Sequence, residues 1–306
     1  MTDTMRCKEL GKTGVRIPEL GLGMWHYHAG PEPLRRGLDT GACFIDTAES
    51  YGNEAVAAEA MADRRAAVFL ATKVSKAHFR RVDLIKAAHD SLSRLRTDRI
   101  DLYQLHEPND DIPVEETLGA MEELVDAGKV RFIGVSNFSL AQLQHARKAM
   151  RKYPIVSNQV RFNLIDRTIA ADLLPYCQAN GITVIAYSPL ARGFQHILDC
   201  DPRGVLQEVA SETGRTPVQV ALNWCLCLDG VVTRPKGNSI GHVLENCGAS
   251  GWHLSPEHIR RIDAAIVFRR RSGIEVLLRR YLPPGLKRGI QGLVQHLPRG
   301  LRRKFN

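Results

Sequence analysis

Short apolar runs alternate with longer segments of helical periodicity along most of this chain. Eight of the runs are rich in β-branched residues, and they span residues 20–23, 43–46, 68–73, 100–106, 130–135, 156–161, 183–187 and 231–235. Runs of this length between helical segments are typical of buried parallel strands joined by crossover helices. Eight such units predict an α/β fold of the (β/α)8 class, a TIM barrel whose sheet closes on itself.

The pattern also predicts helix boundaries and a hairpin. Pro113 and Gly128 bracket a stretch whose apolar residues fall on one face, as in a helix with proline at its start and glycine after its end. Ser139 is placed to cap the next helix. Ahead of the first strand, residues 7–18 predict a β-hairpin that turns near Gly14 and plugs the lower end of the barrel.

A change of pattern after Val267 divides the chain into two predicted parts, a barrel of residues 1–267 and a tail of residues 268–306. Residues 269–306 carry eleven Lys or Arg against one acidic residue, Glu275. The whole chain has a formal charge of +9, so the rest of it sums to −1. Apolar residues at helical spacing between the arginines predict a basic, amphipathic, helical tail.

Such a tail suits an anionic surface. We predict docking on an anionic membrane surface or on an acidic protein partner, because each basic residue near an acidic leaflet contributes roughly 1 kcal/mol. The alternative is a solvated appendage packed on the barrel. Nucleic acid is not an expected partner, because no recognised nucleic-acid-binding module accompanies the charge.

Composition limits the class of protein. The 306 residues are 44% hydrophobic and 25% charged, and no apolar run reaches the roughly 18 residues that a membrane span requires. The first ten residues lack the apolar segment of a secretory signal, so the expected location is the cytoplasm, either free or peripheral to a membrane through the tail. Seven scattered cysteines without a CxxC pair indicate reduced thiols, and no metal site is predicted.

Four polar side chains stand at or just beyond the ends of consecutive predicted strands. They are Asp46, Tyr51, Lys73 and His106. In a barrel of this class the loops after the strands converge on one face, so these side chains are predicted to share a pocket. Each alone also fits a turn, a packing role or a solvated position. Their common placement favours one catalytic site.

The chemistry of these four groups suits the reduction of a carbonyl by a hydride. Tyr51 is the candidate acid that protonates the developing alkoxide. An ammonium at Lys73 favours the phenolate, the charged form of Tyr51. Asp46 pairs with the ammonium, and His106 donates to the carbonyl oxygen and orients it.

Several short sequence motifs between residues 10 and 265 together carry a family resemblance. They are Leu10-Gly11-Lys12-Thr13-Gly14, Asp46-Thr47-Ala48 with Tyr51-Gly52, Ala71-Thr72-Lys73, Asp101-Leu102-Tyr103, Gly134-Val135-Ser136-Asn137-Phe138, Asn158-Gln159, Tyr187-Ser188-Pro189-Leu190 and Pro235-Lys236. In this combination the chain resembles the aldo-keto reductase family, whose barrels bind a nicotinamide cofactor without a Rossmann fold. The resemblance implies that Tyr51, Lys73, Asp46 and His106 form the catalytic tetrad.

The resemblance also implies two groups of cofactor contacts. Ser136, Asn137 and Gln159 match the residues that bind the nicotinamide carboxamide, Tyr187 matches the aromatic that stacks on the nicotinamide ring, and Ser188 and Leu190 follow it. Ser136 and Asn137 could instead cap the next helix. A second group matches the family's segment that binds the adenosine half of the cofactor and its 2′-phosphate. Its members are Lys236, Asn238, Ser239, His242, Glu245 and Asn246.

Two departures from the family pattern bear on the cofactor and the substrate. His242 stands where many members carry an arginine for the 2′-phosphate, so NADP is the expected cofactor, with NAD use allowed. Glu107 stands where many relatives have tryptophan, which favours a polar or cationic substrate unless Glu107 points to solvent. Trp25 keeps the expected aromatic residue of the substrate pocket.

The sequence therefore predicts an NAD(P)H-dependent enzyme that interconverts a small aldehyde or ketone and an alcohol, with Tyr51 as general acid and base. The absence of a GxGxxG motif after the first strand disfavours a Rossmann domain. The alternative function is a non-catalytic, cofactor-binding subunit for redox sensing or protein interaction. The intact set of four polar residues disfavours that alternative.

Overall fold

The computed structural model describes residues 4–268. Except for Phe268, the tail predicted from the sequence lies outside the described residues. All seven cysteines lie within this range, and no disulfide is formed among the residues that the structure describes. In the same range, no helix is both long and apolar enough to cross a bilayer.

Eight parallel strands of the described range form one curled sheet in chain order, from β3 to β10. They are β3 (Leu22–Gly23), β4 (Phe44–Asp46), β5 (Phe69–Val74), β6 (Ile100–Leu105), β7 (Val130–Ser136), β8 (Ile155–Arg161), β9 (Thr183–Tyr187) and β10 (Val231–Thr233). The backbone just before β3 meets β10: the amide of Gly21 donates to the carbonyl of Thr233 at 2.7 Å, and the Thr233 amide to the carbonyl of Glu19 at 2.8 Å. The sheet is therefore closed, and the predicted barrel is confirmed.

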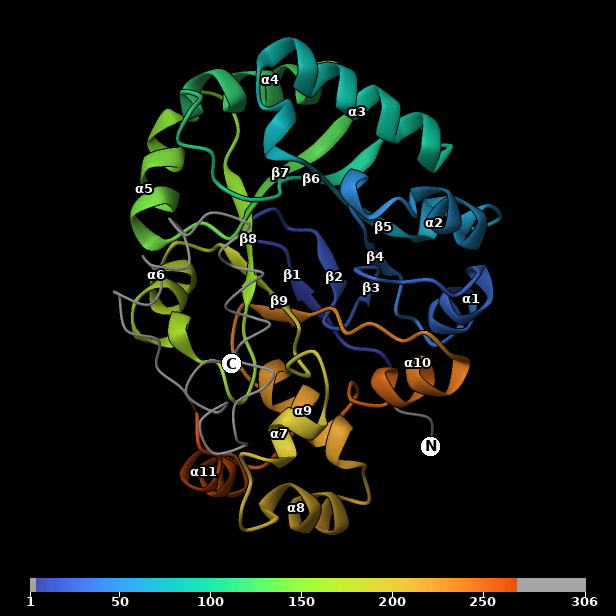
Figure 1. The fold of residues 1–306 in the computed structure, drawn as a ribbon, viewed down its shortest axis with the longest axis vertical. Coiled ribbons are helices and arrows are strands. Elements are labelled where there is room, and N and C mark those ends of the chain that lie inside the picture. Colours follow the sequence, from blue (N-terminus) through green and yellow to red (C-terminus); the bar gives the residue numbers. More distant parts are fainter. Residues whose placement is uncertain (1–3, 269–306) are drawn as a thin grey trace, which may run out of the picture. The chain divides into compact units, whose positions relative to one another are not determined.

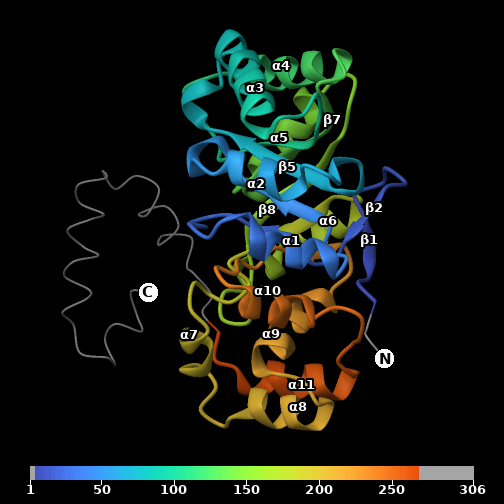
Figure 2. The ribbon, with the colours of Figure 1, turned by 90° about the vertical axis from the view of Figure 1, so that its right-hand side faces the viewer.

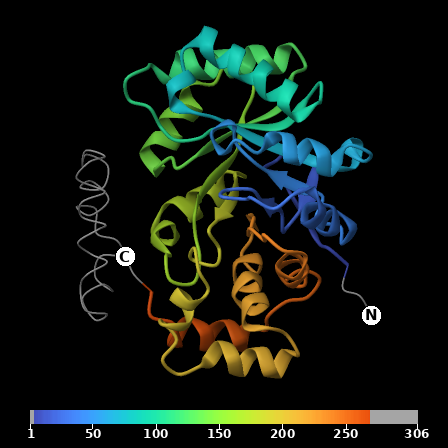
Figure 3. The same ribbon diagram turned by 45° about the vertical axis from the view of Figure 1, so that its right-hand side comes forward.

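Helices surround the sheet in a ring (Figure 1). They are α1 (Pro31–Asp39), α2 (Glu54–Met61), α3 (Arg81–Leu95), α4 (Val114–Asp126), α5 (Leu140–Ala149), α6 (Leu173–Ala179), α7 (Gln195–Leu198), α8 (Val205–Thr213), α9 (Pro217–Leu226), α10 (Ile240–Cys247) and α11 (Pro256–Ala265). Between β9 and β10 the chain adds α7 and α8 to the usual single helix, and α8 lies beside α11 on the outside (Figures 2 and 3).

The predicted helix signals are confirmed. Helix α4 begins directly after Pro113 and is followed by Gly128, whose φ of 67° is a conformation that glycine adopts without a steric cost. Ser139 caps α5 through a capping box with Gln142.

The N-terminal hairpin closes one end of the barrel. Strands β1 (Cys7–Glu9) and β2 (Arg16–Pro18) pair antiparallel and lie in the middle of the ring of helices in Figure 1. Leu10 and Ile17 are fully buried against apolar residues of the barrel interior. The Lys8 ammonium donates to three carbonyls of the segment before and at the start of β10, at 2.6 to 2.8 Å. Because the hairpin covers this end of the barrel interior, an active site is expected at the opposite end of the barrel.

The barrel interior is built in two layers. Successive inward-facing side chains along a strand are two residues apart, and β4, β5, β6 and β10 each contribute to both layers. The lower and upper members are Phe44 and Asp46, Ala71 and Lys73, Leu102 and Gln104, and Val232 and Arg234. The lower layer is apolar and packs against the hairpin. The upper layer is polar and lies at the carboxyl ends of the strands.

Candidate active site

The four predicted catalytic side chains come from three neighbouring strands. Asp46 is the last residue of β4, Lys73 lies near the end of β5, and His106 follows β6 directly. Tyr51 ends η1 (Glu49–Tyr51), a single 3₁₀ turn that continues from β4. Because the strands are parallel, their carboxyl ends share one edge of the barrel, and the four groups meet there.

Asp46 and Lys73 form a fully buried ion pair. The Lys73 Nζ donates to Asp46 Oδ2 at 2.7 Å and to the carbonyl of Thr47 at 2.6 Å. Neither side chain is exposed to solvent. An ammonium held by two short hydrogen bonds in a dry interior keeps its position and orientation.

Tyr51 and His106 lie above this pair. The Tyr51 hydroxyl is 3.5 Å from His106 Nε2, and the two rings meet edge to face with their centres 5.5 Å apart. The Lys73 Nζ lies 5.0 Å from the centre of the Tyr51 ring. Ser50 Oγ is 3.4 Å from the other ring nitrogen of His106. The phenol, the ammonium and the imidazole thus belong to one cluster.

His106 is a neutral imidazole at physiological pH. Burial, together with the positive charge of Lys73, lowers the pKa of His106 from 6.5 to about 4. A neutral imidazole can donate from one nitrogen and accept at the other. His106 can therefore hydrogen-bond a carbonyl oxygen without competing with Tyr51 for the role of acid.

This shift in the pKa of His106 predicts a pH-dependent contribution to stability. Between pH of about 6.5 and about 4 the unfolded histidine binds a proton that the folded one does not. The free energy of unfolding should therefore fall as the pH falls through this window. Urea unfolding of a His106→Asn variant should show a shallower fall than the wild type. His89→Asn, which changes an exposed histidine of α3, should keep the wild-type slope, and equal slopes in all three proteins would contradict the assignment.

Sequence reasoning missed three further partners of Asp46. Gln104 Nε2 and Gln159 Nε2 donate to Asp46 Oδ1 at 3.1 and 2.8 Å. Arg234 Nε lies 2.8 Å from Asp46 Oδ2. Burial alone would raise the pKa of Asp46, but the positive charges of Arg234 and Lys73 outweigh burial and hold that pKa below its usual value. The carboxylate is ionised and fully partnered.

The residues predicted to bind the nicotinamide carboxamide lie next to this cluster. The Tyr187 hydroxyl donates to Asn137 Oδ1 at 2.8 Å, and Asn137 Nδ2 donates to the carbonyl of His106 at 2.9 Å. Ser136 Oγ donates to the carbonyl of Gln159. The Gln159 amide is already used within the barrel, since its nitrogen donates to Asp46 and its oxygen accepts from Arg234 at 2.9 Å.

The loop after β9 has an unusual backbone. Ser188, Ala191 and Arg192 have φ values of 48°, 55° and 64°, in the left-handed region that L-residues seldom adopt. Leu190 is partly buried between them, and the carbonyl of Ser188 accepts from Asn163. Strained positions of this kind cluster at ligand-binding loops, which fits the predicted cofactor contacts of Ser188 and Leu190.

The residues predicted to hold the adenosine half of the cofactor gather after β10 and in α10. Ser239 caps α10 by accepting from the amide of His242, whose side chain is exposed in the first turn. Lys236 Nζ donates to the carbonyl of His26, and Asn246 Nδ2 lies 3.5 Å from the carbonyl of Lys236. The other members of this group are Asn238, which contacts the His28 ring, and Glu245 in α10.

The two residues predicted for the substrate pocket have different surroundings. The Arg192 guanidinium stacks 4.5 Å from the Trp25 ring centre. Glu107 is 49% exposed and lies 3.5 Å from the ammonium of Lys76. The Glu107 carboxylate therefore faces solvent and has a cation beside it, which is the alternative that the sequence left open.

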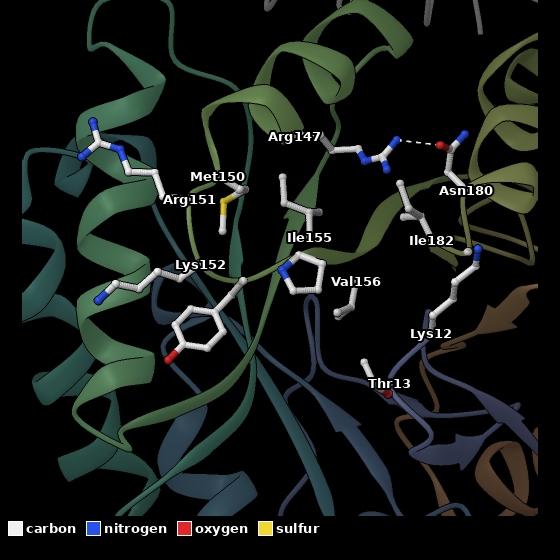
Figure 4. Close-up of a pocket in the computed structure, with 13 residues that line it drawn as sticks. Lys12, Thr13, Arg147, Met150, Arg151, Lys152, Ile155, Val156, Asn180 and Ile182 are labelled. Carbon is white, nitrogen blue, oxygen red and sulfur yellow. Dashed lines mark hydrogen bonds between the residues drawn. The ribbon is translucent and has the colours of Figure 1, made fainter.

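A cavity of about 340 Å³ lies at the other end of the barrel (Figure 4). It is lined by Lys12 of the hairpin, by Ile155 at the start of β8 and by Ile182 just before β9. Arg147, also in the lining, is already bonded to Asn180 at 2.8 Å. This cavity is separate from the polar layer and takes no part in the candidate site.

Comparisons with known proteins agree with this geometry. A family model described as "Aldo/keto reductase family" matches residues 19–267. The methylglyoxal reductase YeaE of Escherichia coli is 36% identical over 261 residues, 82% of this chain and 92% of that protein. The glyoxal reductase of Bacillus subtilis is 34% identical over 257 residues, covering 82% and 90%. The structure of an aldo/keto reductase from Klebsiella pneumoniae in complex with NADP and acetate is 34% identical, covers 88% of this chain and 98% of that one, and gives a TM-score of 0.80.

The closed eight-stranded barrel carries this buried pair, the tyrosine and the histidine at the carboxyl ends of its strands, where barrel enzymes place their active sites. The chain belongs to the aldo/keto reductase family.

Proposed function

We propose that this protein uses NADPH to reduce small aldehydes or ketones to alcohols, with Tyr51 as the proton donor. The observation that carries the proposal is the meeting of Asp46, Lys73, Tyr51 and His106 at the carboxyl ends of β4, β5 and β6. The family supplies the reaction class, an oxidoreductase acting on a carbonyl. The residue roles rest on the geometry.

Each of the four side chains has a distinct task in this proposal. His106, neutral and fixed beside Tyr51, donates a hydrogen bond to the carbonyl oxygen and orients the substrate. Tyr51 gives its hydroxyl proton to the same oxygen as negative charge develops there. The Lys73 ammonium stabilises the phenolate that remains, and Asp46 holds that ammonium in place. In the reverse direction Tyr51 takes the proton back.

The cofactor is NADP(H), and when bound it supplies the hydride. The surrounding groups have suitable chemistry. Tyr187 offers a flat ring and Asn137 an amide beside it, linked by a hydrogen bond of 2.8 Å. Lys236 offers a cation for a phosphate, and the start of α10 offers backbone amides. His242 in that turn is a weaker phosphate partner than arginine, so some use of NAD is expected.

The substrate class we propose is small dicarbonyls and related aldehydes. Relatives named methylglyoxal reductase and glyoxal reductase share about a third of their residues with this chain over nearly their whole lengths. Glu107 is paired with Lys76 and exposed, so it gives no reason to expect a cationic substrate. Trp25 with the stacked Arg192 guanidinium provides a polar, flat wall.

The test is turnover of NADPH by the full chain with methylglyoxal and a panel of small aldehydes and ketones, followed by the loss of NADPH absorbance. The proposal expects turnover with at least one small carbonyl and a higher kcat/KM with NADPH than with NADH. The alternative, a non-catalytic subunit for redox sensing or protein interaction, expects tight NADPH binding without turnover of any carbonyl. That second outcome would overturn the enzyme assignment.

Three further statements remain predictions from the sequence. They are the division into a barrel of residues 1–267 and a tail of residues 268–306, a cytoplasmic location, and docking of the tail on an anionic membrane surface or an acidic protein partner.

A further inference from the structure

Arg234 is a second buried cation beneath the candidate site. It follows β10 directly, is 6% exposed, and places Nε 2.8 Å from Asp46 Oδ2. The same Nε donates to Gln159 Oε1 at 2.9 Å. Nothing in the roles given to Asp46, Lys73, Tyr51 and His106 requires this arginine.

The fold makes room for the Arg234 side chain. Gly23 of β3 lies against it, and a Cβ on Gly23 would come within 3.1 Å of Arg234 Nη1 and 2.5 Å of its carbonyl oxygen. Val232, two residues earlier, faces the apolar layer, so the two-residue period turns Arg234 inward as well. The guanidinium is therefore held inside the barrel and is almost completely shielded from solvent.

Arg234 changes the charge of the reaction centre. In the described part of the chain, the charged side chains that contact Asp46 are Lys73 and Arg234. One carboxylate and two cations give this buried cluster a formal charge of +1. A guanidinium keeps its proton even when buried, so Arg234 contributes its positive charge at every physiological pH.

This charge lies next to the residue proposed to stack on the cofactor. The Arg234 Cζ is 5.8 Å from the centre of the Tyr187 ring. The nicotinamide ring is neutral in NADPH and carries a positive charge in NADP⁺. A fixed positive charge in a dry interior disfavours a second one nearby, and water screens the repulsion only weakly there.

We propose that Arg234 is a positioning residue that gives the reaction centre a net positive charge and makes the site bind NADPH in preference to NADP⁺. This inference rests on the proposed function, because it requires the nicotinamide to lie beside Tyr187. The charge of Arg234 favours one direction of the reaction, which the four catalytic groups alone do not do. The oxidised cofactor is released more readily, which favours carbonyl reduction over alcohol oxidation.

The test is the ratio of the Kd for NADP⁺ to the Kd for NADPH, measured by titration of the full chain. Wild-type protein should bind NADPH more tightly. In Arg234→Met the ratio should fall about tenfold, since one buried unit charge is removed. Arg234→Lys should keep most of the wild-type ratio because the charge remains. A purely structural role for Arg234 would weaken both cofactors alike and leave the ratio unchanged.

The matched control is Arg65→Met. Arg65 also pairs with a buried carboxylate, Asp101, at 2.9 Å, but at the starts of β5 and β6, away from the site. Its loss should change stability without changing the ratio. If Arg234→Met does not fold, Arg234→Gln replaces it. If neither variant folds, the test is the wild-type ratio of the two Kd values, and a ratio near one overturns the inference.

Two results would overturn the inference. One is a wild-type protein that binds NADP⁺ as tightly as NADPH, and the other is a folded neutral variant with the wild-type ratio. Failure of the proposed function is distinguishable, because it would appear as an absence of NADPH binding or of carbonyl turnover in the wild type.

Discussion

A Tyr51→Phe variant is expected to lose about a thousandfold in kcat for carbonyl reduction, since general acid catalysis contributes roughly 10²–10⁴-fold. The change removes only the hydroxyl, which lies 3.5 Å from His106 Nε2 and is the proposed proton donor. The ring and its contact with the Lys73 ammonium remain, so folding and NADPH affinity should be close to those of the wild type. Steady-state kinetics and NADPH titration measure the two quantities.

Tyr153→Phe is the matched control. It also removes one phenol hydroxyl, here hydrogen-bonded to Asp126 at 2.8 Å near the barrel's other end, and should leave kcat unchanged. If Tyr51→Phe kept most of the wild-type kcat while Tyr153→Phe behaved as expected, Tyr51 would not be the acid. Loss of NADPH binding in Tyr51→Phe would instead indicate a role in cofactor contact.

The barrel could be predicted from the sequence because fully buried parallel strands are nearly continuous apolar runs. Each of the eight runs contains or overlaps a strand, and the differences are a few residues at the ends. The four catalytic candidates could be predicted for a related reason. Each ends or closely follows such a run, and the parallel topology alone brings those ends to one edge.

The three further partners of Asp46, which are Gln104, Gln159 and Arg234, could not be predicted in the same way. Arg234 lies near the end of the predicted run of residues 231–235, and an arginine at such a position usually reaches solvent. Its inward direction follows from the two-residue period through Val232, and this period is informative only once the barrel interior is known. The left-handed Ala191 and Arg192 also gave no signal, because neither is a glycine.

Asp46→Asn should destabilise the protein more than any other single change in the reaction centre, by about 3–5 kcal/mol, as removal of one partner from a buried ion pair typically does. The variant leaves Lys73 and Arg234 buried together without a carboxylate. Arg234 keeps its charge even when it is buried without a carboxylate. The shape of the side chain is retained, so packing contributes little to the loss.

Lys73→Met is the informative comparison. Asp46→Asn removes the negative charge of the cluster and makes its net charge more positive, whereas Lys73→Met removes one of the two positive charges. Arg234 remains 2.8 Å from Asp46, so one cation still faces one anion and the cluster becomes neutral. Urea unfolding should therefore give a clearly smaller loss for Lys73→Met than for Asp46→Asn, while both variants lose carbonyl reduction. A loss for Lys73→Met equal to or greater than that for Asp46→Asn would mean that Arg234 does not share the carboxylate, and the net positive charge of the reaction centre would have to be abandoned with it.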